Sequence, residues 1–143
     1  MKIALASDHG GFELKEAVKE YLNKKGIETV DLGTNSLESV HYPEYGKKCG
    51  EYVASGKAEL GIVCCGTGIG ISIAANKVKG IRCANVTSKK MAALAKEHNH
   101  ANILALGGRI LTNEEAFEFI DTWLETEEGH DRHDVRVAML NEM

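Results

Sequence analysis

Short apolar runs and amphipathic segments alternate along the whole chain, and this alternation restricts the fold more than any other feature. Apolar runs predict strands at residues 2–7, 27–33, 60–65, 81–86 and 102–108. Helical spacing of apolar residues predicts helices at residues 12–26, 42–56, 70–78, 88–99, 112–129 and 131–143. This order is typical of an α/β protein with a parallel sheet covered on both faces. Ligands of such sheets bind beyond the carboxyl ends of the strands.

Several helix starts carry residues that suit a first helical turn. Pro43 fits the beginning of its helix, because the fixed φ of proline is compatible with the first turn. Either Thr87 or Ser88 is expected to cap the helix predicted at residues 88–99. Thr112 and Glu115 have the spacing of a capping box.

Composition indicates one soluble domain spanning residues 1–143, with 43% hydrophobic and 27% charged residues. The net charge of −4 argues against nucleic acid or an anionic membrane as the main partner. No apolar stretch approaches the length of a membrane span. The opening "MKIALASDHGG" is too short before its first charged residues to be a signal peptide, so we expect a cytoplasmic protein.

The four cysteines lack the C-x-x-C spacing of zinc and thioredoxin-type sites; they are Cys49, Cys64, Cys65 and Cys83. A disulfide between the adjacent Cys64 and Cys65 would be strained. In a reducing cytosol we therefore expect free thiols.

The stretch "GIVCCGTGIGISIAANK", residues 61–77, joins a strand to a helix through a glycine-rich turn. Backbone N–H groups and the helix dipole there favour negative charge, either a phosphate or an oxyanion formed during a reaction. The spacing is not that of a Walker A loop, and a dinucleotide fingerprint would need G-x-G-x-x-G where this turn has G-x-G-x-G. A cysteine phosphatase would need arginine at position 71, which is Ile71.

Two interpretations of this turn remain equally good from the residues alone. In the first, Cys65 is favoured as a thiolate by the helix start and removes a proton from carbon, while the amides of residues 66–70 hold the resulting enediolate. In the second, Cys65 is a buried core thiol and the glycines only pack the strand on the helix.

An ordered set of motifs spans nearly the entire chain: "SDHGGFELK", "YPEYG", "CGTGIGISIAANKVKGIRCA", "EHNHANILALGGR" and "RHDVR". With this set the chain resembles the type B ribose-5-phosphate isomerases, a family that also includes galactose-6-phosphate and allose-6-phosphate isomerases. The resemblance implies a flavodoxin-like, three-layer fold with strand order 2-1-3-4-5. It further implies a homodimer, or a dimer of dimers, whose subunits share each active site, and aldose–ketose isomerisation without metal or cofactor.

The resemblance also assigns catalytic roles. Cys65 matches the base that moves the proton, Thr67 matches a residue that assists it, and His98 matches the residue that opens the sugar ring. The anion hole would consist of Gly66, Gly68, Ile69 and Gly70. From spacing alone, His98 reads instead as a packed histidine near a helix end.

Substrate contacts follow in the same way. Asp8, Tyr42 and Asn99 match residues around the sugar, and the phosphate contacts match His9, Arg109, Arg132 and Arg136. Without the resemblance, Asp8 is a turn residue, Tyr42 belongs to a helix start, and the last two arginines lie on a solvated helix face. The chain departs from the family pattern at His41, at His100 and at residues 129–131.

We therefore expect interconversion of ribose 5-phosphate and ribulose 5-phosphate. Within the same chemistry, a hexose 6-phosphate such as allose 6-phosphate is the alternative. In a different class, the chain would be a non-catalytic sensor of a sugar phosphate or a nucleotide, and a bound flavin would reveal itself by colour.

Overall fold

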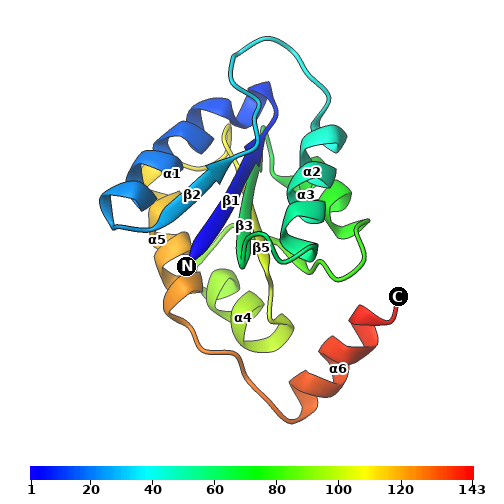
Figure 1. Cartoon of the computed structure of the whole chain (residues 1–143). Helices are drawn as coiled ribbons and strands as arrows, with labels where there is room; N and C mark the ends of the chain where they lie inside the picture. The colour runs from blue at the N-terminus through cyan, green and yellow to red at the C-terminus, as the bar shows by residue number, and fades with distance from the viewer.

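The computed structural model describes residues 1–143 as a five-stranded parallel sheet with helices on both faces (Figure 1). The strands are β1 (Lys2–Ser7), β2 (Glu28–Asp31), β3 (Leu60–Cys65), β4 (Cys83–Asn85) and β5 (Ile103–Gly107). The helices are α1 (Phe12–Lys24), α2 (Tyr42–Ala54), α3 (Ile69–Asn76), α4 (Lys89–Asn99), α5 (Asn113–Glu125) and α6 (Arg132–Asn141), with a short 3-10 turn, η1 (His9–Gly11). No helix has the length and apolarity that a membrane crossing requires.

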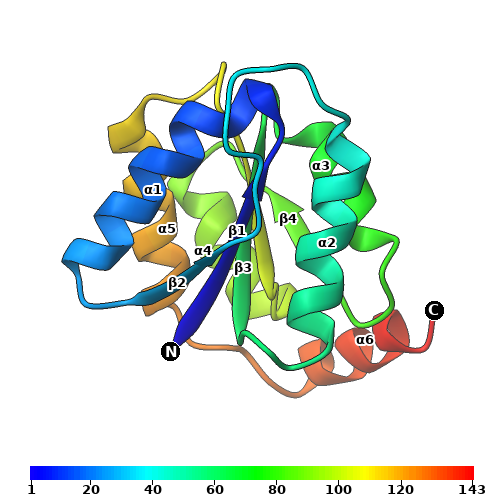
Figure 2. The ribbon, with the colours of Figure 1, turned by 45° about the horizontal axis from the view of Figure 1, so that its top comes forward.

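The predicted α/β class is confirmed, but the predicted strand order 2-1-3-4-5 is wrong, because the sheet runs β2-β1-β3-β5-β4. The chain leaves β3 for the sheet edge at β4 and then turns back to β5, which pairs with β3. Crossovers between parallel strands are right-handed, so a crossover that runs back across the sheet places its helix on the other face from a crossover that runs outward. Helix α4 therefore lies on the face of α1 and α5, and α2 and α3 cover the other face (Figure 2).

Each face of the sheet has its own apolar core. On one face, Leu14 and Val18 of α1 and Trp123 of α5 pack on Leu5 and Leu104 of the sheet. The other core contains Val53 of α2, Ile71 and Ala75 of α3, and Val63, Ile103 and several alanines of the strands. Removing these side chains from water is the main term that stabilises the layers.

The helix starts follow the sequence signals. Ser88 caps α4 by accepting from the Met91 N–H, and Thr112 and Glu115 form the expected capping box at α5. Pro43 lies in the first turn of α2. The observed β2 and β4 are shorter than predicted, and α5 ends at Glu125 instead of residue 129.

Candidate functional site

The glycine turn connects the carboxyl end of β3 to the start of α3 and has a conformation that glycine permits. Gly68 has φ +84°, the left-handed region that other residues avoid. A methyl group at Gly68 would also lie only 2.5 Å from Oδ1 of Asn85. Close packing and backbone conformation therefore both require glycine at this position.

The thiol of Cys65 is held at this turn, since its Sγ accepts a hydrogen bond from the Gly68 N–H at 3.1 Å. Such a donor stabilises a thiolate more than a thiol. Burial raises the pKa of Cys49 and of Cys64, and it raises the pKa of Cys83 to about 12, so these thiols are unreactive. Cys65 is the cysteine that the turn equips for chemistry.

Two amides of the turn already have side-chain acceptors. The Gly68 N–H donates to Cys65, and the Ile69 N–H donates to Oγ1 of Thr67 at 3.1 Å. The next N–H groups of α3 lie in its first turn, where no intrahelical acceptor is available to them. Thr67 thus stabilises the turn, and the start of α3 provides donors for an anion.

Tyr42 and Arg109 border the turn from other elements. A methyl group at Gly70 would lie 2.6 Å from Cε1 of Tyr42, so the phenol ring packs directly on this glycine. A methyl group at Gly66 would lie 3.2 Å from Nη1 of Arg109. The Arg109 N–H also donates to the Gly66 carbonyl at 2.9 Å, which ties the end of β5 to the turn.

The loop after β1 brings Asp8 and His9 to the same edge of the sheet. Asp8 is buried, and its Oδ1 accepts from the Gly11 N–H at 3.1 Å, which matches its role as a turn residue and leaves Oδ2 available. Nδ1 of His9 accepts from the Val40 N–H at 3.2 Å, so a neutral ring carries its proton on Nε2. His9 is thereby fixed as a donor toward a ligand.

The remaining predicted residues lie at the opposite edge of the sheet. Helix α4 starts beyond the carboxyl end of β4 and ends before the amino end of β5, so His98 and Asn99 are at the amino edge. His98 stacks on His133 of α6 with ring centroids 4.4 Å apart. This contact brings the exposed Arg132 and Arg136 of α6 to the same edge.

One chain therefore carries two separate groups of predicted site residues. From Gly61 to Cys65, β3 spans about 13 Å, and this length separates the two edges. The structure brings together Asp8, His9, Tyr42, Cys65, Gly66, Thr67, Gly68, Ile69, Gly70 and Arg109. Four predicted residues lie apart from this group, at the opposite edge of the sheet: His98, Asn99, Arg132 and Arg136.

Sequence reasoning missed two residues beside these groups. Oδ1 of Asn85 is buried without a hydrogen-bond partner and lies against Gly68. Its sequence signal was its place at the end of a strand, on the edge that binds ligands. His133 is buried against His98; burial, Arg132, His98 and Arg136 lower its pKa, so it is neutral at pH 7.

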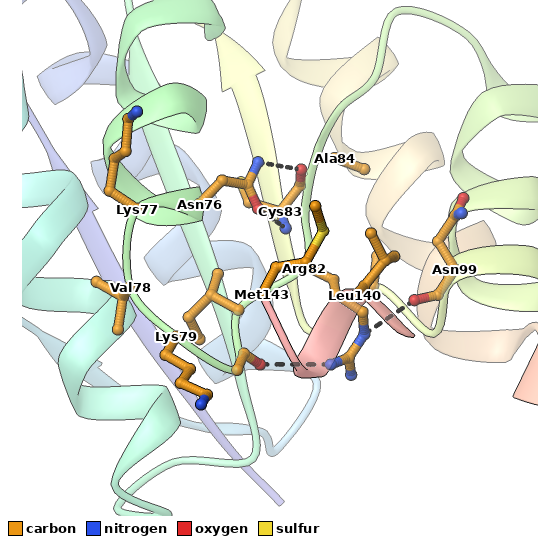
Figure 3. A pocket seen from close by; sticks show the side chains of 13 residues that line it. Asn76, Lys77, Val78, Lys79, Arg82, Cys83, Ala84, Asn99, Leu140 and Met143 are labelled. Atoms are coloured by element: carbon orange, nitrogen blue, oxygen red, sulfur yellow. Dashed lines mark hydrogen bonds between the residues drawn. The ribbon is translucent and has the colours of Figure 1, made fainter. Parts of the chain in front are cut away.

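A cavity of about 670 Å³ lies between the loop after α3 and the end of α6 (Figure 3). Asn99 is in its wall, but no residue of the glycine turn is. Arg82, also in the wall, uses its guanidinium on the carbonyls of Gly80, Asn99 and His100. Because its cation is already engaged, we assign the chemistry to the glycine turn and not to this cavity.

Comparison with known proteins gives a consistent result. A family model described as Ribose/Galactose Isomerase matches residues 3–140. The chain is 43% identical over 139 residues to ribose-5-phosphate isomerase B of Escherichia coli, which covers 97% of this chain and 93% of that protein.

Solved structures of the same family also resemble this chain in fold and sequence. The chain aligns with a TM-score of 0.98 and 51% identity to ribose-5-phosphate isomerase B of Clostridium thermocellum, over 99% of this chain and 96% of that one. It aligns with a TM-score of 0.94 and 38% identity to the Mycoplasma genitalium enzyme, solved with bound ribulose-5-phosphate, over 99% of this chain and 94% of that one.

Proposed function

Because the chain belongs to the ribose/galactose isomerase family, we propose that it interconverts ribose 5-phosphate and ribulose 5-phosphate. The observation that carries this proposal is the thiol of Cys65 at the start of α3, hydrogen-bonded to the Gly68 N–H. This arrangement combines a base with donors for an oxyanion, which is what proton transfer next to a carbonyl requires.

The reaction needs only proton transfers, since aldose and ketose are isomers. The Cys65 thiolate takes the proton from C2 of the open-chain aldose, and the electron pair moves onto the carbonyl oxygen to give an enediolate. Amides at the start of α3 stabilise this oxyanion. The hydroxyl proton then moves from O2 to O1, and the Cys65 thiol returns its proton to C1, which yields the ketose and restores the thiolate.

The phosphate and the closed sugar ring need further groups. His9 and Arg109 lie beside the turn and suit part of the phosphate, because guanidinium and imidazole N–H groups donate to its oxygens. His98, which would open the sugar ring, lies at the opposite edge of the sheet from the glycine turn of the same chain. The same is true of Arg132 and Arg136, which would bind the phosphate. A second copy of the chain can supply them.

We propose a homodimer in which the glycine turn of one protomer faces the α4–α6 end of its partner. Exposed apolar side chains support this arrangement on both sides. Ile69 and Ile73 are each 56% exposed beside the turn, and Val135 and Met139 are 63% and 65% exposed on α6. Burying such surface is a general driving force for association.

The four free cysteines fit a reducing compartment, so we propose that the enzyme works in the cytoplasm. A hexose 6-phosphate remains the second candidate substrate, and the family description, which names galactose beside ribose, favours it. The chemistry at Cys65 would be unchanged, and only the length of the bound sugar would differ.

An isomerase assay with ribose 5-phosphate beside allose 6-phosphate and galactose 6-phosphate, in the presence of a chelator, tests the proposal. Strong turnover of the pentose alone is the expected result. Preference for a hexose would retain the mechanism and change the substrate. A folded protein that binds these sugars without converting them would overturn the enzymatic proposal in favour of a sensor.

A further inference from the structure

Four of the six histidines of the chain gather where the end of α4 meets the start of α6, although they come from two distant parts of the sequence. They fall into two clusters with neighbouring acids. Glu97, His98 and His133 form one, and His100, His130 and Asp134 form the other. The second cluster has no part in the function proposed above.

We propose that His100, His130 and Asp134 bind a divalent transition-metal ion of the zinc class. Two imidazoles and one carboxylate, with a fourth position open, are a donor set that suits Zn²⁺. Magnesium and calcium prefer oxygen donors throughout, so the two imidazoles disfavour them. This inference does not depend on the isomerase proposal.

The donor atoms lie nearly where a metal ion would need them. Oδ1 of Asp134 is 3.2 Å from Nδ1 of His130 and 3.9 Å from Nε2 of His100. All donor atoms of the cluster lie within 4.8 Å of one another. Ligands at zinc bond lengths of about 2.0–2.1 Å in a tetrahedron are roughly 3.3 Å apart. Small side-chain movements, together with a shift of the Gly129 carbonyl away from Nε2 of His100, would complete the site.

The cluster combines one fixed ligand with two accessible ones. His100 caps α4 in the left-handed conformation, and its side chain is 10% exposed. Its carbonyl accepts hydrogen bonds from Nε and Nη2 of Arg82, which fix the backbone. The side chains of His130 and Asp134 are 69% and 51% exposed in the single chain.

Binding would change the protonation of His100. Its Nε2 lies 2.6 Å from the Gly129 carbonyl, so without a metal it donates a proton there. A metal ion needs the Nε2 lone pair, which moves the proton to Nδ1. Oε1 of Glu128 lies 4.0 Å from Nδ1 and would accept this proton after moving within hydrogen-bond distance. A carboxylate behind a ligating histidine orients the ring in many metal sites.

The cluster of Glu97, His98 and His133 is the competing location for an ion. There His98 is stacked on His133, and the positive charges of Arg132 and Arg136 act on His133 and oppose a cation, against the single carboxylate of Glu97. The cluster of His100, His130 and Asp134 adjoins a further carboxylate, Glu128, instead. Charge therefore favours the site that we propose.

Isothermal titration calorimetry of the chelator-treated full-length protein with zinc chloride tests the inference. We expect one ion per chain, and at least a tenfold loss of affinity in each of His130→Ala and Asp134→Asn. The matched control is His41→Ala, which removes an exposed histidine outside the cluster and should leave zinc affinity unchanged. Zinc should also raise the melting temperature of the wild type and of His41→Ala, but not that of His130→Ala.

Both principal variants replace exposed side chains, so an unchanged melting temperature without metal will show that they fold. No zinc binding by the wild type would overturn the inference. Undiminished binding by His130→Ala and Asp134→Asn would overturn it as well. Loss of zinc binding in His98→Ala, with binding kept in His130→Ala, would also overturn the inference. The ion would then belong to the cluster of Glu97, His98 and His133.

Discussion

Cys65 and Gly68 constrain each other, and the glycine turn depends on both. The hydrogen bond from the Gly68 N–H fixes the position of the thiol, and the positive φ of Gly68 directs the chain from this turn into α3. The sequence predicted this turn, because a glycine-rich segment between an apolar run and a helical pattern is typical of a strand–turn–helix connection. It did not predict Asn85, whose contact with Gly68 depends on where β4 lies in the sheet.

Replacing Cys65 with alanine should reduce kcat by about a thousandfold, since general-base catalysis contributes roughly 10²–10⁴ in rate. Binding of ribulose 5-phosphate, measured by calorimetry, should stay within about threefold, because the amides and basic residues remain. Cys83→Ala is the matched control, as its unreactive thiol lies outside the turn. Near-normal turnover by Cys65→Ala would show that another group is the base.

Replacing Gly68 with alanine should lower both stability and turnover. Positive φ costs alanine about 1–2 kcal/mol, and the new methyl group would press on Oδ1 of Asn85. Gly26→Ala is the control, because Gly26 also has positive φ, at +78°, but has no atom within 4 Å of a new methyl group. Gly26→Ala should therefore lose stability alone. Equal turnover losses in both variants would contradict the role of the turn.

At the scale of elements, periodicity identified the strands and helices, and caps located several helix starts. The order of the strands could not be read in this way. The step from β4 to β5 turns back, and this reversal sets α4 on the face of α1 and α5. No residue in "IRCANV" marks that reversal, because it is decided by packing across the sheet.

Arg82 connects the two elements, α4 and α6, that carry the smaller group of candidate residues. Its guanidinium donates to the carbonyls at the end of α4 and to Oδ1 of Asn141 in α6, at 2.6 Å. Arg82→Met should therefore raise KM about tenfold by loosening the elements that carry Arg132 and Arg136, and affect kcat less. Lys77→Met, in the wall of the same cavity, is the control and should keep KM. Unchanged KM in Arg82→Met would contradict this connection.

The contact between α1 and β2 predicts a pH dependence of stability. Burial opposes ionisation of Asp31, but hydrogen bonds from Lys15, Lys19 and the Gly33 N–H bring its pKa below the ordinary value. The ionised form is therefore favoured in the folded state. Its contribution to stability is complete above the ordinary aspartate pKa of about 3.9, and it is lost as pH falls through the lowered pKa.

Asp31→Asn removes this effect and leaves Lys15, 1% exposed, without its main partner. We expect a loss of about 3 kcal/mol at pH 7 in urea unfolding, and a smaller loss of stability than the wild type shows on lowering the pH below 4. Glu118→Gln, at an exposed position, should leave both quantities unchanged. A wild-type pH profile in Asp31→Asn would contradict the assignment.

At the scale of the whole molecule, the two groups of candidate residues lie at opposite edges of one sheet. The resemblance predicted shared active sites, but the sequence could not assign residues to protomers, because that depends on where helices end relative to strands. The structure separates Cys65 from His98 by the length of the sheet. Our account therefore requires a partner at every active site.

Co-expression of Cys65→Ala with His98→Ala tests this central claim most directly. A mixed dimer would contain one site with both changes and one site with neither, so random pairing of two inactive variants should restore about a quarter of wild-type turnover. Differently tagged chains allow the mixed dimer to be purified, and it should have half of wild-type activity per dimer. If Cys65 and His98 of the same chain worked together, the mixed dimer would be as inactive as its parents, and our account would be wrong.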